Sequence, residues 1–461
     1  MTINQTQLSS KELQQQDAHG WFQGLLGNSC CSSESKNCDD DDDDDDDDDM
    51  TKMKALVVAP MVEQSDLPFR LLCRKYGANL CYTPMFHARM FLTRPRYRAQ
   101  FWNLDVIRKI NKKDRPLIVQ FCGGDPMEML EAAKVVEDHC DAVDVNCGCP
   151  QGIARRGNYG AFLLEKEELL LKIVRVLHEG LKKVPVTVKV RLLPPKCCTM
   201  QEKGCTCQSD GSVYCLESSL SLYERLIDAG AAILTVHCRT RHQKGHNTGA
   251  ADWSAVRQVV EKLGHRIPII ANGGIANMDD VEQCLLETKA DGVMSSEAVL
   301  EYPPIFKRNG SHTKFSNNKR TGPGRVALCN EYLDIAEEYP PDVGGQGSGM
   351  KCVRTHIHHF LSADLESNPT VRDMTISAKS YGDLRKALQA IELYHNQSNM
   401  EVEDETQHWY FRHRCEDKEG KMVSKTAMFG KSQILAGGEL NEETAKGIAC
   451  LFGNCNDASD Y

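Results

Sequence analysis

The stretch Asp-Val-Asn-Cys-Gly-Cys-Pro-Gln, residues 144–151, combines a thiol with backbone constraints that hold it in place. Asp144 and Asn146 alternate with valines, which predicts a short strand whose polar side chains point to one side. Gly148 allows the chain to turn, and Pro150 restricts Cys149 to an extended conformation. A thiol at such a position can act as an acid, act as a nucleophile, or pack as a small core residue.

Short apolar segments followed by helix-compatible sequence recur along the middle of the chain. The expected strands are 55–59, 80–83, 116–121, 142–146, 185–190, 232–236, 267–271 and 291–294. Eight such units over roughly 250 residues predict an α/β fold of the TIM (β/α)8 barrel type. A doubly wound open sheet is the alternative.

The carboxyl ends of these strands are polar, and barrel enzymes place their chemistry at those ends. In the fifth strand Thr187, Lys189 and Arg191 share one face, and the sixth strand repeats the pattern with Thr235, His237 and Arg239. Charges that point into a barrel need partners or a bound ligand. The polar strand ends are Gln120, Asn146, Lys189, Arg191, His237, Arg239, Asn272 and Ser295.

Glycines follow the seventh strand, where Asn272 is succeeded by Gly273 and Gly274, and the eighth strand ends at Ser295. Barrels commonly bind phosphate through backbone amides at the ends of strands seven and eight. The sequence therefore predicts a cofactor that carries a phosphate.

Composition places limits on the class of protein. The net charge is −10, but residues 39–49 are eleven consecutive aspartates, and the remainder of the chain carries +1. The 21 cysteines lie in apolar segments as often as in loops, which is typical of a reducing compartment. No apolar run approaches the roughly 18 residues of a membrane span. We expect a cytoplasmic or nuclear protein that is a monomer and contacts no membrane.

Six segments together are similar to the tRNA-dihydrouridine synthases. The resemblance extends in order from Met53 to Phe306, and the segments Tyr82–Ala88 and Tyr159–Leu164 are most similar to the eukaryotic branch that acts on D-loop positions 16 and 17. The six segments are 59–70, 144–150, 186–191, 235–241, 251–253 and 270–275.

The resemblance implies an enzyme in which FMN lies over the barrel mouth, NADPH or NADH reduces the flavin, and hydride passes to C6 of a tRNA uridine. It implies that Cys149 donates a proton to C5, and that Asn146, Arg239 and Arg241 contact the substrate. The residues that it places at the cofactor are Pro60, Met61, Gln120, Lys189, His237, Asn272, Gly273, Gly274 and Ser295. A flavin enzyme of free pyrimidines and an inactive RNA-binding barrel are the alternatives.

The remaining segments divide the chain around the barrel at 53–306. Residues 1–52 are expected to be a disordered acidic tail, 307–325 a basic linker, and 326–396 a helical tRNA-binding domain, while 397–461 stay unassigned. Residues 196–217 form a Cys-rich insertion whose spacing fits no standard zinc pattern, so a mobile, a metal-binding and a redox-sensing loop stay open. His356, His358 and His359 show no carboxylate or cysteine partner at ligand spacing, and no metal is expected.

Overall fold

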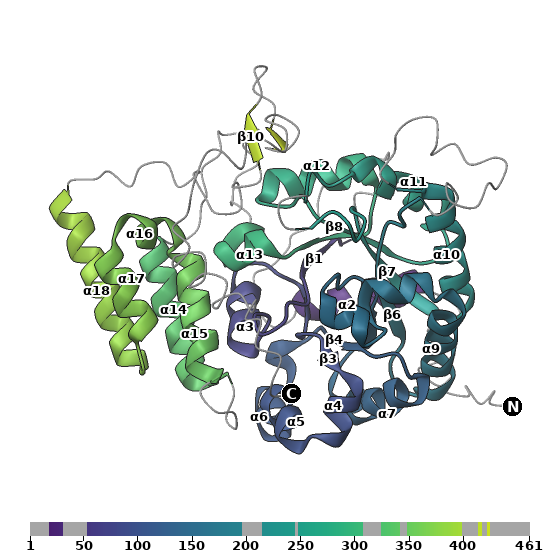
Figure 1. The fold of residues 1–461 in the computed structure, drawn as a ribbon, viewed down its shortest axis with the longest axis horizontal. Coiled ribbons are helices and arrows are strands. Elements are labelled where there is room, and N and C mark those ends of the chain that lie inside the picture. Colours follow the sequence, from purple (N-terminus) through teal and green to yellow (C-terminus); the bar gives the residue numbers. More distant parts are fainter. Residues whose placement is uncertain are drawn as a thin grey trace, which may run out of the picture.

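Eight parallel strands close into a barrel. Strand β1 pairs with both β2 and β9, and β2 also pairs with β4, so the sheet has no free edge. The short strand β3 (Phe86–His87) extends the sheet beside β4. The TIM barrel prediction is confirmed, and the doubly wound sheet is excluded because the ring closes (Figure 1). The barrel strands are β1 (Ala55–Val58), β2 (Leu80–Tyr82), β4 (Leu117–Cys122), β5 (Ala142–Asn146), β6 (Val186–Arg191), β7 (Ala231–His237), β8 (Ile269–Asn272) and β9 (Gly292–Ser295).

This computed structural model describes residues 18–30, 53–195, 214–244, 248–307, 324–341, 348–398, 414–416 and 422–424. Residues 414–416 (β10) and 422–424 (β11) form an antiparallel pair. The predictions made for the remainder of the acidic tail, for most of the Cys-rich insertion and for the basic linker lie outside the described residues. Within the described part, no helix has both the length and the apolar character needed to cross a membrane.

Helices cover the outside of the barrel and bury one face each. In α9 (Glu167–Gly180), for example, Leu170, Val174 and Leu177 recur at helical spacing and are buried. The other barrel helices are α3 (Leu67–Lys75), α4 (Ala88–Thr93), α5 (Pro95–Phe101), α6 (Leu104–Ile110), α7 (Pro126–Val136), α8 (Gly152–Arg156), α10 (Leu216–Asp228), α11 (Trp253–Leu263), α12 (Met278–Thr288) and α13 (Glu297–Glu301).

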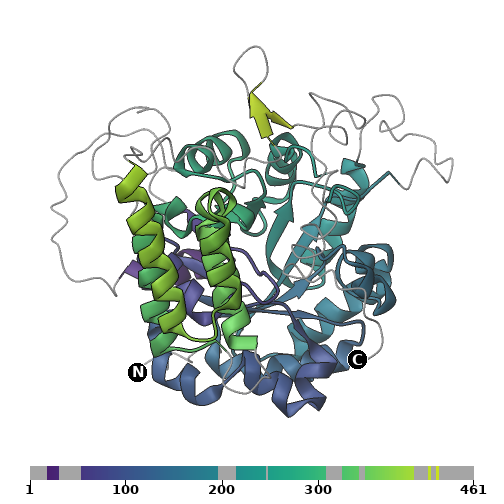
Figure 2. The ribbon, with the colours of Figure 1, turned by 60° about the vertical axis from the view of Figure 1, so that its left-hand side comes forward.

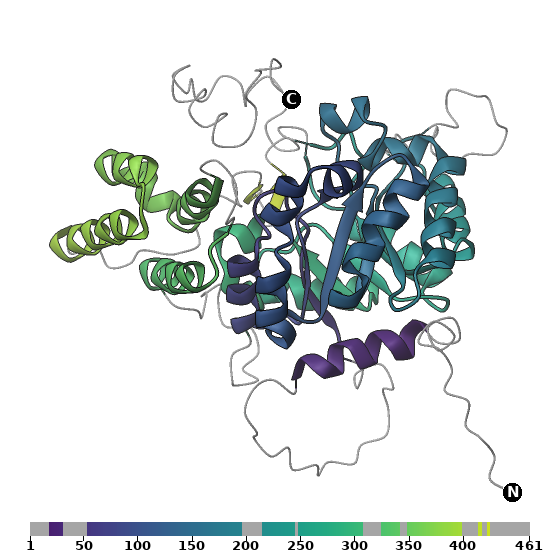
Figure 3. The same ribbon diagram turned by 90° about the horizontal axis from the view of Figure 1, so that it is seen from below.

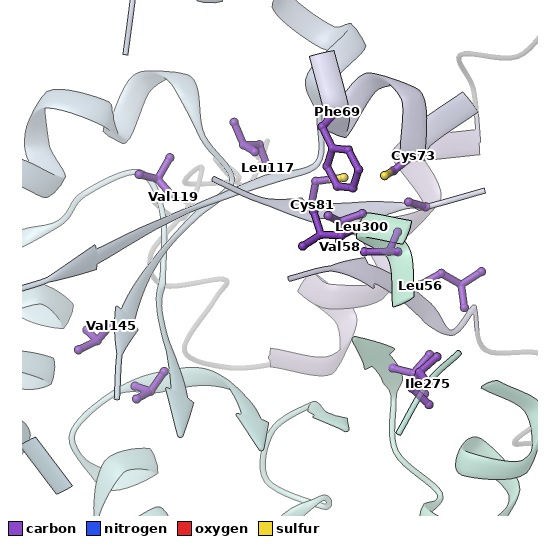
Figure 4. Packing of buried hydrophobic residues seen from close by; sticks show 14 of the residues in the cluster. Leu56, Val58, Phe69, Cys73, Cys81, Leu117, Val119, Val145, Ile275 and Leu300 are labelled. Atoms are coloured by element: carbon purple, nitrogen blue, oxygen red, sulfur yellow. The ribbon is translucent and has the colours of Figure 1, made fainter. Parts of the chain in front are cut away.

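Alternation along the strands separates two cores. Leu56, Val58 and Val119 point outward and pack under the helices with Phe69 of α3 (Figure 4). Val57, Tyr82 and other residues of opposite parity point into the barrel and form a second cluster. Because each strand is buried on both sides, its inward polar residues near the carboxyl end are enclosed rather than solvated.

A helix from the N-terminal segment closes the lower end of the barrel, and here the expectation of a disordered tail is wrong. Helix α2 (Ala18–Cys30) lies across the base (Figure 3), and its Phe22, Leu25 and Leu26 join the apolar cluster inside the barrel. His19 donates to the carbonyl of Gly264 at 2.9 Å. The acidic and polar composition of residues 1–52 masked the few apolar residues of this helix. Their packing partners come together only when the barrel folds.

Five further helices stand beside the barrel and lie next to one another (Figures 1 and 2). They are α14 (Arg325–Glu338), α15 (Ser348–Phe360), α16 (Ser362–Ser367), α17 (Pro369–Ser377) and α18 (Tyr381–Ser398). Their apolar core is continuous with the outer core of the barrel. A buried ion pair also joins the two parts, because Arg325 of α14 donates to Glu301 of α13 at 3.1 Å.

We predict that Leu26→Ala lowers the free energy of unfolding by about 2–5 kcal/mol, because it leaves a cavity where α2 enters the barrel base. Leu26 is 0% exposed, whereas Leu286 on α12 is 69% exposed, so Leu286→Ala is the matched control and should change stability by no more than about 0.5 kcal/mol. Urea unfolding followed by circular dichroism measures both. Equal effects of the two substitutions would contradict the role assigned to α2.

Candidate active site

Strand register brings the polar strand ends to one level around the barrel mouth. Asn146 of β5 lies opposite Lys189 of β6, and Arg191 lies opposite His237 of β7. His237 in turn lies opposite Asn272 of β8. Residues that are 35 to 46 positions apart in sequence thus become neighbours, as the sequence pattern predicted.

The side chain of Asn146 connects two parts of the site. Its amide nitrogen donates to Gln120 Oε1 at 2.7 Å, and its carbonyl oxygen accepts from the backbone nitrogens of Gly148 and Cys149 at 3.2 and 3.0 Å. Gln120 donates in turn to buried Asp144 at 2.8 Å. These bonds fix the orientation of both amides, because each carbonyl oxygen faces donors and each nitrogen faces an acceptor.

The loop that carries Cys149 is held at its backbone carbonyls as well. Arg191 Nε donates to the carbonyl of Gly148 at 2.6 Å, and the backbone nitrogen of Ala161 donates to that of Cys149 at 2.9 Å. A Cβ atom at Gly160, whose φ is +64°, would lie 2.6 Å from the Cys149 carbonyl oxygen, so only glycine fits. The thiol is therefore positioned by contacts from three separate segments.

Cys149 and Cys147 have different surroundings. Cys147 is fully buried among the outer core residues, whereas Cys149 is partly exposed beside Cys122 and Tyr159. Burial raises the pKa of the Cys149 thiol, and the bond to the Gln151 backbone and the charge of Arg191 offset part of that effect. Cys149 thus stays protonated at neutral pH and keeps a proton to donate.

Four cationic or titratable groups lie together at the mouth, and two of them, Lys189 and Arg191, are buried. Burial, followed by the charge of Arg191, lowers the pKa of Lys189 to about 7, although Asp144 acts in the opposite direction. Burial and the same cationic neighbours hold the pKa of His237 well below its usual range. His237 is therefore neutral, and because Arg239 can only donate to its Nε2, at 3.3 Å, the ring proton resides on Nδ1.

The loops after β8 and β9 form the opposite wall. Gly273 and Gly274 have φ values of +114° and +84°, which favour glycine, and a Cβ at Gly273 would lie 3.1 Å from the guanidinium of Arg239. Lys189 Nζ donates to Asn272 Oδ1 at 2.6 Å, and Trp253 Nε1 donates to the carbonyl of Gly273 at 2.9 Å. A cation therefore stands directly beside the glycine turn.

Two of the predicted site residues, Ser295 and Arg241, already have partners within the protein. Ser295 is buried and donates its hydroxyl proton to the carbonyl of Ile275 at 3.0 Å, so it holds the loop after β8. Arg241 forms an ion pair with Glu165 and lies over the ring of Phe162, with 5.3 Å from Cζ to the ring centroid. Its charge is already compensated within the protein, unlike a guanidinium poised for an anionic substrate.

Pro60 and Met61 lie where β1 ends and are both partly exposed. The backbone nitrogen of Met61 donates to the Ser65 hydroxyl at 2.9 Å, which closes a tight turn before α3. The side chain of Met61 packs against both apolar clusters. This segment therefore forms a fixed wall of the mouth between the loops of β9 and β2.

Two side chains to which the sequence assigned no role in binding or catalysis, Asp144 and Arg191, also organise the mouth. Asp144 accepts from Gln120 and from Thr187, at 2.8 and 2.7 Å, and burial raises its pKa to about 6. Arg191 bridges the loops after β5 and β7, because it also donates to the carbonyl of Thr240 at 3.0 Å. The signal for both was their place on the polar face of a strand that is otherwise made of valines.

A comparison with protein families identifies the family to which a chain with this barrel mouth belongs. The model of the family described as dihydrouridine synthase (Dus) matches residues 57–207 and 212–396, which include the barrel mouth and the helices beside it. The chain belongs to the dihydrouridine synthase family. The resemblance inferred from the sequence is thereby confirmed.

Curated relatives narrow the branch within this dihydrouridine synthase family. The chain is 39% identical over 70% of its length to the tRNA-dihydrouridine(16/17) synthase [NAD(P)(+)] of Saccharomyces cerevisiae, of which the match covers 70%. It is 37% identical over 72% of its length to the protein of the same name from Schizosaccharomyces pombe, with 78% of that protein covered. The similarly named protein of Rattus norvegicus is 37% identical, and the match covers 73% of this chain and 66% of the relative.

We predict that Lys189→Met stabilises this dihydrouridine synthase most at acidic pH. Because the pKa of Lys189 is lowered to about 7 in the folded protein, the unfolded chain binds more protons between pH 7 and the ordinary lysine pKa. The wild-type protein therefore gains stability relative to the variant as pH rises above 7, by at most about 1.4 kcal/mol per pH unit. Unfolding midpoints of both proteins at pH 6 and pH 8 test this, and a difference that is independent of pH would contradict it.

Proposed function

We propose that this protein reduces the C5–C6 double bond of uridines 16 and 17 in the D-loop of tRNA, using FMN as the bound cofactor and NADPH or NADH as the reductant. The observation that carries the proposal is the position of the protonated thiol of Cys149. Asn146 accepts a hydrogen bond from the Cys149 backbone at the barrel mouth, where Arg239 also lies beside the glycine turn. The family and the names of the relatives agree with this activity.

The residues of the mouth fit a flavin phosphate. Arg239 supplies positive charge beside the glycine turn at Gly273, whose backbone lacks the Cβ that would keep a phosphate away. Asn272, Gly273 and Gly274 would hold the phosphate, and Gln120, Lys189 and His237 would face the ring system. When bound, FMN would supply hydride to C6 of the uracil.

The protein's own part in the reaction is to hold the base and to provide a proton. Cys149 gives the proton on Sγ to C5 of the uracil, and the resulting thiolate takes a proton from solvent to complete the cycle. Burial favours the protonated thiol before the reaction, while the nearby guanidinium of Arg191 favours the thiolate that forms. Neutral His237 and the Lys189 ammonium can donate hydrogen bonds to a developing negative charge.

The helices α14–α18 are the proposed tRNA platform. Lys379 and Lys386 are exposed, so their ammonium groups are available to contact phosphates. Exposed lysines and arginines are the usual means by which proteins bind the nucleic acid backbone. Arg385 is less suited to that role, since its guanidinium already binds Asp334 and Glu337 at 2.8 and 2.7 Å. The platform also favours tRNA over a free pyrimidine as substrate.

We predict that Cys149→Ala lowers dihydrouridine formation by about a hundredfold to ten-thousandfold, the usual range for losing a general acid. Reduction of the flavin by NADPH should continue at the wild-type rate, because the thiol acts only after hydride is available. The assay incubates each protein with NADPH and with tRNA that lacks dihydrouridine. Mass spectrometry measures the dihydrouridine formed, and absorbance follows reduction of the flavin. Cys284→Ala on α12 is the matched control and should retain full activity.

Two outcomes would redirect this proposal. Full dihydrouridine formation by Cys149→Ala would remove the thiol from the proton transfer and leave the overall activity in place. Flavin reduction without any modified tRNA, accompanied by turnover of free uracil, would favour an enzyme of free pyrimidines. Purified protein that binds no flavin at all would exclude both enzymes.

We predict that Gly273→Ala retains at most about a tenth of the wild-type flavin after gel filtration. An L side chain at φ +114° costs roughly 1–2 kcal/mol, and its Cβ crowds Arg239 at 3.1 Å. Gly382→Ala on α18 is the control, because its Cβ would meet no atom closer than 3.7 Å. Wild-type flavin content in both variants would show that the turn does not approach the cofactor.

A further inference from the structure

Three side chains with metal-binding atoms meet where the barrel joins α15, away from the barrel mouth. Cys352 and His356 lie four residues apart on α15 and so share one face of the helix, and Asp66 precedes α3. One ligand atom from each residue lies within 4.8 Å of the other two. The expectation that His356 has no cysteine or carboxylate partner was therefore wrong: Cys352 lies one helical turn away, and Asp66 comes from the barrel.

The cluster is more enclosed than a surface ion pair. His356 is 0% exposed, and its ring stacks on Phe69 with 4.6 Å between the centroids. Its Nε2 and the Oδ1 atom of Asp66 are 2.6 Å apart and share a proton. The second carboxylate oxygen of Asp66 is also buried, and Tyr332, whose ring lies 4.9 Å from that of His356, interacts with Asp66 as well.

One side of the cluster opens onto a cavity. Asp66 and Cys352 line a pocket of about 130 Å³, together with Glu63 and residues of α5 and α6. A buried water needs only a fraction of that volume and two or more polar partners. The cavity can therefore hold a water molecule as a further ligand beside the three side chains.

We propose that Asp66, Cys352 and His356 form a zinc site with a water molecule in the fourth position. Zinc accepts thiolate, imidazole and carboxylate ligands in tetrahedral sites, whose corners lie roughly 3.5 Å apart. The ion replaces the proton shared by His356 and Asp66 and the proton of the Cys352 thiol, and both protons pass to solvent. A harder cation such as Mg²⁺ does not fit, because it selects oxygen ligands.

This zinc site lies behind the turn that leads from Pro60 and Met61 into α3. Several bonds already tie that turn to α15, since Gln64 binds His359 at 3.2 Å and Cys352 Sγ donates to the carbonyl of Glu63 at 3.2 Å. Zinc would replace the Cys352 bond to Glu63 with coordinate bonds across the same junction and would leave the Gln64–His359 bond in place. Bound zinc therefore fixes the helical platform relative to the segment that forms one wall of the barrel mouth.

The test is zinc binding by the full-length protein. Cys197, Cys198, Cys205 and Cys207 are first replaced by serine, because the Cys-rich insertion could bind zinc independently. After treatment with a chelator and dialysis against Zn²⁺, we expect one equivalent of zinc per chain by elemental analysis. Adding Cys352→Ala to this background should weaken the affinity at least tenfold in competition with a chromogenic chelator.

Two further measurements separate a zinc site from a structural effect. Zn²⁺ should raise the thermal midpoint of the background protein, Mg²⁺ should not, and Zn²⁺ should have no such effect on the Cys352→Ala variant. Cys284→Ala in the same background should keep both the zinc and the shift. The proposal is overturned if the background protein binds no zinc, or if Cys352→Ala binds it with unchanged affinity.

Discussion

The barrel mouth depends on the side chain of Asn146, which makes hydrogen bonds in two directions. Its oxygen accepts from two backbone amides of the thiol loop, and its nitrogen donates to Gln120, which is fixed in turn by buried Asp144. In a site shielded from water, an amide that loses one of these bonds leaves a buried polar group unsatisfied, at a cost of roughly 1–3 kcal/mol. The chain of bonds therefore determines a single position for Cys149.

The second constraint on the mouth is excess positive charge in a buried place. Lys189, Arg191 and Arg239 gather around neutral His237, and Asp144 is the carboxylate that acts on Lys189. Burying like charges together is unfavourable, as the lowered pKa values of Lys189 and Arg191 record. An anionic ligand would relieve that penalty on binding, so the same charges would favour the proposed phosphate-bearing cofactor and a transition state with developing negative charge.

Interactions outside the mouth support it from two sides. Helix α2 fills the base of the barrel with Phe22 and Leu26, so the ring of strands encloses a packed core below the site. The helices beside the barrel share its outer core, and His356 of α15 binds Asp66 in the turn after β1. The helices beside the barrel are therefore tied directly to the turn that follows Met61.

The sequence by itself determined the barrel, the position of its polar residues at the carboxyl ends of the strands, and the loop that carries Cys149. These follow from local rules, because a period of two assigns each strand residue to a face, and parallel strands in a closed barrel place all their carboxyl ends together. The family resemblance added the expectation of flavin and tRNA chemistry, and the names of the relatives agree with its tRNA and NAD(P) part.

Tertiary structure alone decided which partners these residues meet. Helix α2 gave no signal among acidic and polar residues, because its apolar face is short and is complementary only to a barrel base assembled from distant strands. The compensation of Arg241 by Glu165 and the approach of Asp66 to His356 depend on contacts between residues 76 and 290 positions apart. The periodicity of apolar residues cannot predict such contacts, because it assigns residues only to the faces of helices and strands and to turns. Burial and charge pairing depend on which distant segments the fold packs against each face.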